Sequence, residues 1–97
     1  MVSIVQMARF VAKSGKSAIL GEHLAAVVTQ TRQEVGCLRY ELYQDEQDRW
    51  VMFEIWAGPE AIDHHLEQPY IVDFIAAMEG LVDGAPEVEV FRPADEK

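Results

Sequence analysis

The stretch Cys37–Trp56, "CLRYELYQDEQDRWVMFEIW", decides the fold of this 97-residue chain. Two runs rich in aromatic and β-branched residues are separated by four polar residues, "DEQD", at positions 45–48. Such runs around a short polar turn are typical of an antiparallel hairpin. We therefore expect strands over Cys37–Gln44 and Arg49–Ala57.

Alternation along these strands assigns each side chain to one of two faces of a sheet. The second strand places large apolar groups on both faces, which indicates that both faces are covered. The predicted sets are Leu38, Tyr40 and Leu42 against Arg39, Glu41 and Tyr43, then Val51, Phe53 and Ile55 against Trp50, Met52, Glu54 and Trp56.

The segment before the hairpin predicts a strand and a helix. β-Forming residues over Val2–Ala12 favour a strand, and Ser14-Gly15-Lys16 interrupts it, with Ser14 as the expected N-cap. Apolar residues then recur at helical spacing, and Gly36 follows as the expected C-terminal cap. The predicted buried stripe is Leu20, Leu24, Val27, Val28, Thr31 and Val35.

The segment after the hairpin predicts a second helical region and a last strand. Gly58-Pro59-Glu60 is typical of a helix start, and Pro69 predicts a kink or a fresh start. A short strand is expected over Glu87–Arg92, and a tail over 92–97. The apolar stripe of the second helical part is Tyr70, Ile71, Phe74, Ile75, Met78 and Leu81.

The resulting order, β-α-β-β-α-β, predicts an α+β fold of the ferredoxin-like split βαβ type. One domain spans 1–97, with four antiparallel strands and both helices on one face of the sheet. The other face would then be a bare apolar surface, which points to a protein partner. A small chain with 49% hydrophobic residues would bury this surplus by forming a homodimer.

Composition narrows the possible partners. The net charge of −9 argues against nucleic acids and anionic membranes, because phosphate groups are bound by clustered Lys and Arg. No apolar run approaches the roughly 20 residues of a membrane span, and the first residues do not resemble a signal peptide. The single cysteine, Cys37, is expected in the core, and it favours a reducing, cytoplasmic location.

At this point the sequence resembles a known family. The runs "GCLRYELYQDEQD" and "FEIWAGPEAIDHHLEQPY", with Gly15-Lys16 before them and "EVEVF" after them, are similar to antibiotic biosynthesis monooxygenases. The resemblance implies a dimeric α+β barrel, in which two sheets pack face to face and each protomer has a small cavity between sheet and helices. It also implies oxidation of phenols, quinols or polyketide-like aromatics with O2, without a metal or other cofactor.

Cofactor-independent oxygenation needs a base, a few hydrogen-bond donors and a dry aromatic wall. His65 matches the histidine of the family and flanks the apolar side of its helix, so we expect it to act as the base. His64 points about 100° away around the helix and is expected in solvent. Glu54, mid-strand among apolar neighbours, needs a partner or a shifted pKa, and Arg39 or His65 are the candidate partners.

Other residues are expected to bind substrate: Trp56 and Tyr70, where relatives have pocket aromatics, and Arg39, Phe74 and Met52. Each candidate has a structural alternative. His65 could only pack at the sheet edge, Glu54 could form a structural ion pair, and Tyr70 could belong to the core. No metal site is expected, because adjacent histidines are poorly placed to chelate one ion. Haem degradation is disfavoured, since the chain contains no Asn and Pro69–Leu81 contains no His.

Three functions remain open from the sequence. The first is an enzyme, a cofactor-independent monooxygenase. The second is an isomerase or small-molecule-degrading enzyme that uses His65 as a proton shuttle. The third is a non-catalytic ligand-binding dimer. Fold alone does not separate them, because one scaffold hosts many functions.

Overall fold

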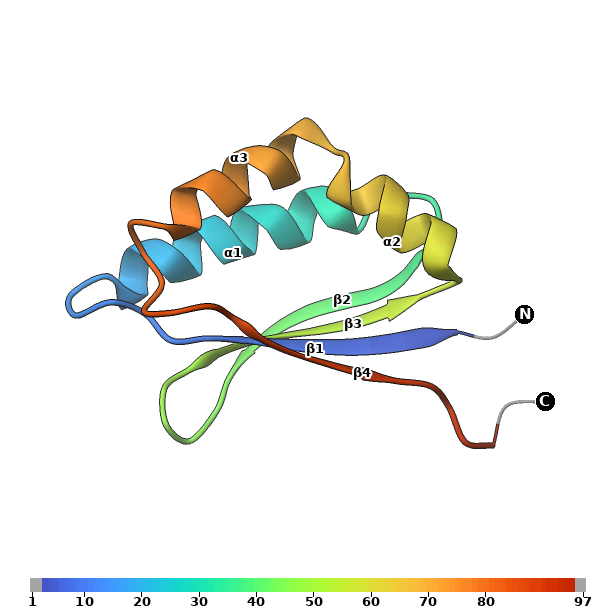
Figure 1. Cartoon of the computed structure of the whole chain (residues 1–97), viewed down its shortest axis with the longest axis horizontal. Coiled ribbons are helices and arrows are strands. Elements are labelled where there is room, and N and C mark those ends of the chain that lie inside the picture. Colours follow the sequence, from blue (N-terminus) through green and yellow to red (C-terminus); the bar gives the residue numbers. More distant parts are fainter. Residues whose placement is uncertain (1–2, 96–97) are drawn as a thin grey trace.

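The computed structural model describes residues 3–95 and has the predicted ferredoxin-like α+β architecture (Figure 1). A four-stranded antiparallel sheet, in the order β2-β3-β1-β4, carries all helices on one face. Val2 and the last two residues of the expected tail lie outside the described residues. The elements are β1 (Ile4–Phe10), α1 (Ser17–Thr31), β2 (Cys37–Gln44), β3 (Trp50–Trp56), α2 (Pro59–Leu66), α3 (Pro69–Met78) and β4 (Glu87–Phe91).

The limits of α1 differ from those predicted. Ser14 is not the N-cap, because the Lys16 N–H bonds to the Lys13 carbonyl in a tight turn and the helix begins only at Ser17. The helix ends at Thr31, where turn-type hydrogen bonds lead the chain off the helix axis. Val35 therefore leaves the stripe and is 91% exposed, while Leu20, Leu24, Val27, Val28 and Thr31 are buried as predicted. Gly36 has φ 90° in the turn before β2 rather than at a helix cap.

The second helical region is divided as Pro69 predicts. Pro59 occupies the first turn of α2, and Gln68 is extended, which is the conformation favoured before proline. A new helix, α3, begins at Pro69, so that α2 and α3 meet at an angle over the sheet (Figure 1). This bend places the end of α2 above β3.

The hairpin confirms the predicted strands but contains a bulge. The register shifts between Cys37 and Arg39, so that Cys37 lies opposite Trp56 and Leu38 is the extra residue. Leu38 is consequently 55% exposed, and its predicted place on the inner face is wrong. Cys37 packs against the core as expected, and burial raises the pKa of its thiol to about 11.

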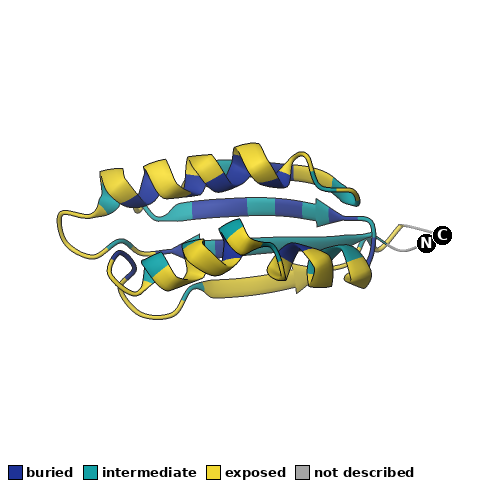
Figure 2. Ribbon diagram, turned by 90° about the horizontal axis from the view of Figure 1, so that it is seen from above, coloured by how far each residue is buried: buried dark blue, intermediate teal, exposed yellow. Residues whose placement is uncertain are grey.

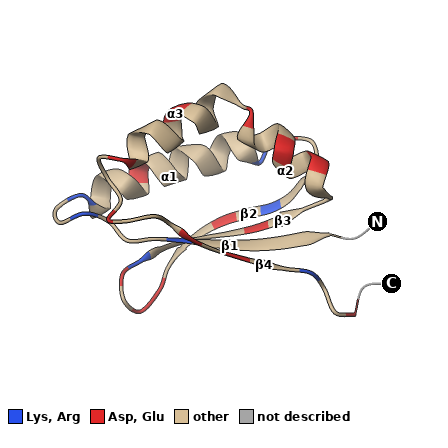
Figure 3. Cartoon of the chain, viewed as in Figure 1, with Lys and Arg blue, Asp and Glu red and all other residues tan. Residues whose placement is uncertain are grey.

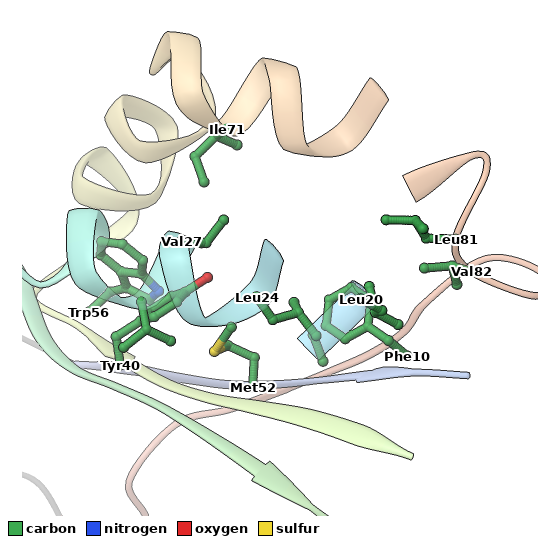
Figure 4. Packing of buried hydrophobic residues seen from close by; sticks show 12 residues of the cluster. Phe10, Leu20, Leu24, Val27, Tyr40, Met52, Trp56, Ile71, Leu81 and Val82 are labelled. Atoms are coloured by element: carbon green, nitrogen blue, oxygen red, sulfur yellow. The ribbon is translucent and has the colours of Figure 1, made fainter. Parts of the chain in front are cut away.

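The hydrophobic core lies between the sheet and the helices (Figures 2 and 4). Leu20 and Leu24 of α1 are fully buried and pack over Met52 of β3, which is 1% exposed. β4 is exposed along its length, and it lies at the edge of the sheet opposite β2, the strand that α1 contacts (Figure 2). None of the helices in residues 3–95 combines the length and hydrophobicity needed to cross a bilayer.

The outer face of the sheet is less uniformly apolar than the sequence predicts. Phe53 and Ile55 are half-buried there, and Val51 is buried. Ion pairs lie beside this strip, as the charged residues on the sheet indicate (Figure 3). The pairs are Arg9–Glu89, Arg39–Glu41 and Arg49–Asp45.

Candidate functional site

A cavity of about 280 Å³ lies between the inner face of the sheet and the α2–α3 bend. Its floor contains a row of three residues on adjacent strands, because Glu54 of β3 pairs with both Tyr40 of β2 and Gln6 of β1. Ala8 lies beside this row, and its small side chain leaves room above the sheet. The apolar roof consists of Val27, Ile62, Leu66, Ile71, Phe74 and Ile75.

His65 enters this cavity from α2 and is held by a carboxylate. Its side chain is 7% exposed, and Nδ1 lies 2.9 Å from Oε2 of Glu34. The Tyr70 hydroxyl donates to the same carboxylate oxygen and lies 3.1 Å from Oγ1 of Thr31. A carboxylate on one ring nitrogen fixes the orientation of the imidazole and favours the tautomer with the proton on Nδ1. The other nitrogen, Nε2, is then the one left to exchange a proton with a molecule in the cavity.

Trp56 contacts both ionisable groups of the cavity, Glu54 and His65. It is fully buried, and its indole Nε1 donates to Oε1 of Glu54 at 2.8 Å. The same indole packs against the His65 ring, with the centroids 4.8 Å apart. One buried side chain thus positions both Glu54 and His65.

Burial raises the pKa values of three ionisable side chains in and around the cavity, Glu54, Tyr40 and Tyr70. It raises the pKa of Glu54 to about 7, although the hydrogen bond from Trp56 works against this rise. Glu54 therefore exchanges a proton readily near neutral pH. Burial, and then the neighbouring Glu54, raises the pKa of Tyr40 above its ordinary value, so the Tyr40 hydroxyl remains a donor. Burial and the bond to Glu34 raise the pKa of Tyr70 to about 12.

The predicted site residues fall into three groups. His65, Glu54 and Phe74 line the cavity together. Trp56 and Tyr70 support the lining through hydrogen bonds. The remaining two lie elsewhere: Met52 is in the core, and Arg39 is on the outer face.

Neither of the two candidate partners of Glu54 bonds its carboxyl group in the described structure, since Arg39 bonds Glu41 and His65 bonds Glu34. Arg39 lies opposite Ile55 on the other face of the sheet, where its guanidinium bonds Glu41 at 2.7 Å. The hydrogen-bond partner of Glu54 is the indole of Trp56 instead. His64, as expected, is exposed, and it bonds Gln68 in the connection between α2 and α3.

Three residues of the site were not predicted from the sequence: Glu34, Tyr40 and Gln6. A signal for Glu34 existed, because it follows Thr31 by three residues and so continues the spacing of the predicted apolar stripe as an acid, although α1 itself ends at Thr31. Its second oxygen, Oε1, is buried without a hydrogen-bond partner among residues 3–95. Tyr40 and Gln6 had no comparable signal, since their roles depend on strand pairing.

A larger depression of about 610 Å³ lies on the outer face. It is lined by Arg9, Arg39, Glu41 and Phe53, among others, and its charged groups are paired with one another. It has no counterpart of the buried carboxylate and imidazole of the inner cavity. We therefore place the candidate site in the inner cavity. Within residues 3–95, His, Cys, Asp and Glu nowhere form a group of three that could hold a metal ion.

Comparisons with known proteins identify the family of this chain and structures that are similar to it. The sequence model of the family described as "Antibiotic biosynthesis monooxygenase" matches residues 3–77. The chain is 31% identical over 94 residues to "Putative monooxygenase Rv0793" of Mycobacterium tuberculosis, covering 96% of this chain and 93% of that protein. It is also 29% identical over 70 residues to an uncharacterized Synechocystis protein, sll1783. This match spans 70% of the present chain but only 48% of that longer relative.

Solved structures agree with these sequence relationships. The structure of Rv0793 superposes with a TM-score of 0.91 at 30% identity, covering 97% of both chains. Protein SO0527 of Shewanella oneidensis gives 0.89 at 32% identity and covers 95% of this chain and 91% of that one.

Proposed function

Because the chain belongs to the antibiotic biosynthesis monooxygenase family, we propose that it oxidises a small phenol, quinol or polyketide-like aromatic with O2, without a metal or flavin. The mycobacterial relative, named as a monooxygenase, supports this class of reaction. The observation that carries the proposal is the pairing of a carboxylate-held imidazole with a desolvated carboxyl group in one apolar cavity.

The first step activates the substrate. Triplet O2 reacts slowly with a closed-shell phenol, whereas a phenolate passes one electron to it easily. His65 Nε2 takes the proton of the ring hydroxyl while Glu34 holds Nδ1. The apolar roof excludes water from the anion and from the radical pair that follows.

The second step uses Glu54 in its protonated form. Superoxide and the substrate radical combine at a ring carbon, and Glu54 gives its proton to the peroxide. The resulting carboxylate takes the hydrogen of that carbon as a proton, and the O–O bond breaks. The leaving hydroxide takes the proton held by His65 and becomes water.

Atoms and electrons then balance without an external reductant. The substrate supplies all four electrons and becomes a quinone that contains one oxygen atom of O2. The other oxygen atom leaves as water, and both side chains return to their starting protonation states. The cavity is lined by neither Lys nor Arg, which disfavours a phosphorylated substrate.

We also propose that the chain works as a homodimer through the outer face of its sheet. The half-buried Phe53 and Ile55 on this face support the assembly, because a second copy would cover the part of them that is still exposed. The flanking ion pairs would form the polar rim of such an interface. The cytoplasm remains the expected location, in keeping with the single unpaired Cys37.

Oxygen uptake by metal-free protein tests the proposed reaction. Naphthohydroquinones and anthrones are supplied as substrates. Incorporation of labelled oxygen into the product is followed by mass spectrometry. We expect His65→Gln to slow uptake by about 10²–10⁴-fold, the usual contribution of a general base. His64→Gln, the exposed neighbour, is the matched control and should behave as wild type. Uptake no faster than autoxidation, or equal uptake by both variants, would contradict the proposal.

A further inference from the structure

Two polar groups on the cavity floor are not used by the proposed reaction. The Tyr40 hydroxyl and the Gln6 amide flank Glu54 on either side, each in direct register with it on the neighbouring strand. Both residues line the cavity, and neither side chain has a hydrogen-bond partner in the part of the chain that the structure describes. Within residues 3–95, neither group is among the fully buried atoms without a partner, so both are open to the cavity and available to bind a water or a ligand.

The direction of the Tyr40 hydroxyl is fixed by its neighbours. The ring contacts Trp56 edge-on at 6.0 Å and lies 5.7 Å from the His65 ring. Figure 4 shows the hydroxyl rising from the sheet toward Val27, into the space beneath the helices. A rigid ring with a protonated hydroxyl is suited to donate a hydrogen bond to an oxygen atom held beside Glu54.

The pairing of the strands sets the distance between Tyr40 and Gln6. Neighbouring strands are about 4.8 Å apart, so the backbones of Tyr40 and Gln6 are separated by about 10 Å across β3. The cavity of about 280 Å³ offers space for a planar ring above Glu54, with Ala8 in the adjacent floor and Phe74 and Ile71 in the roof. The carboxyl of Glu54 and the absence of Lys and Arg from the lining favour a neutral ligand.

We propose that Tyr40 and Gln6 are the specificity residues of this cavity and select neutral rings that carry two oxygen substituents. Tyr40 donates a hydrogen bond to the oxygen nearer His65, and the Gln6 amide binds the second oxygen on the far side of Glu54. The reason for expecting a ring rests on the proposed function. The selection itself depends only on the two unpaired groups and their register.

Binding without turnover tests this selection. Naphthohydroquinone, α-naphthol and naphthalene, which carry two, one and no hydroxyl groups, are titrated into the protein under anaerobic conditions. Affinities are read from NMR shifts of the Ile62 and Ile71 methyl groups, which line the cavity. We expect wild type to prefer naphthohydroquinone over α-naphthol by about tenfold, the effect of one net hydrogen bond.

The variants Gln6→Leu and Tyr40→Phe remove one polar group each. Gln6→Leu should bring the ratio between naphthohydroquinone and α-naphthol close to one. Tyr40→Phe should weaken both hydroxylated probes by about tenfold and leave naphthalene unchanged. Tyr43→Phe is the matched control, since Tyr43 is exposed on the outer face and bonds Glu41.

The ratios within one protein separate recognition from a general loss of folding. Equal affinities of wild type for the three probes, no binding of any, or wild-type ratios in Gln6→Leu would overturn the proposal. The outcome is also distinct from that of the oxygen-uptake test. If naphthohydroquinone is preferred but never oxidised, the oxidation fails and the recognition stands.

Discussion

Replacement of Glu54 by Gln should make the protein more stable at high pH and leave it nearly unchanged in mild acid. Glu54 is 8% exposed, and burial raises its pKa from the ordinary 4.5 to about 7. The folded state therefore prefers the protonated side chain, and ionisation of Glu54 works against folding. Gln is neutral at every pH and keeps an oxygen that accepts the hydrogen bond from the Trp56 indole.

The sign and the size follow from proton linkage. Between pH 4.5 and pH 7 the folded state binds more protons at Glu54 than the unfolded state, so stability falls as the pH rises. The contribution is fully present below pH 4.5 and is lost by about pH 7. At about 1.4 kcal/mol per pKa unit, the loss amounts to about 3 kcal/mol. Groups with lowered pKa values, such as Asp45 and Glu41, act in both proteins alike and cancel in the comparison.

Urea unfolding from pH 4.5 to pH 8.5 measures this difference. Both proteins are compared at one concentration, because dimerisation would link stability to concentration. The advantage of Glu54→Gln over wild type should grow from near zero at the acidic end to about 3 kcal/mol above pH 7. Glu67→Gln, an exposed carboxylate at the end of α2, is the control and should follow wild type. A constant offset between Glu54→Gln and wild type across this range would refute the reasoning, because it would mean that Glu54 titrates normally.

Three further substitutions test other parts of the structure. Gly36→Ala should lower the free energy of unfolding by about 1–3 kcal/mol, since φ is 90° and the new Cβ would lie 2.6 Å from that of Ala61; unchanged urea midpoints would argue against this turn. Glu34→Ala should cost about 1–3 kcal/mol, because it leaves the imidazole Nδ1 unpaired and leaves the Tyr70 hydroxyl with Thr31 as its remaining partner, and should shift the imidazole nitrogen signals in NMR; unaltered signals would exclude the contact. Phe53→Lys should convert the proposed dimer into a monomer of 11.0 kDa by light scattering, because pairing would bury the new charge; a persistent dimer would place the interface elsewhere.

Periodicity was sufficient to predict the elements of the fold. The apolar stripe from Leu20 to Thr31 and the alternation from Trp50 to Trp56 are strong signals. The buried face of the helix and the two faces of the strand are those that the sequence predicts. The ends of elements were less predictable. Ser14 has the right side chain for an N-cap, but a preceding turn around Gly15 delays the helix to Ser17. Local turn hydrogen bonds compete with helix capping, and residue type alone does not decide between them.

The candidate site was predictable only in part, for the same physical reason. His65 and Glu54 stand out as ionisable groups among apolar neighbours, so the sequence identifies them. The partner of His65, however, comes from a segment distant in the chain, whereas Glu54 is bonded by Trp56 of its own strand. Glu34 reaches His65 across 31 positions of sequence, and no local pattern encodes that contact. The family resemblance indicated aromatic residues near the site, yet Trp56 and Tyr70 support it by hydrogen bonding and are not among the residues that line the cavity.

The register of the β2–β3 hairpin decides which side chain lies beside Glu54 in the cavity. Gln44 pairs with Trp50 across the turn, and this pairing alone places Tyr40 opposite Glu54. A shift by one residue would place Arg39 there instead, and a buried ion pair would then hold Glu54 ionised. The observed register puts an uncharged hydroxyl beside the carboxyl group, so desolvation is not compensated by a cation and Glu54 remains able to exchange a proton near neutral pH. The Asp45 carboxylate fixes this register through bonds to the backbone of Gln47 and Arg49. The acidic turn, which lies at the far end of the hairpin, thus helps to keep an uncharged side chain beside Glu54.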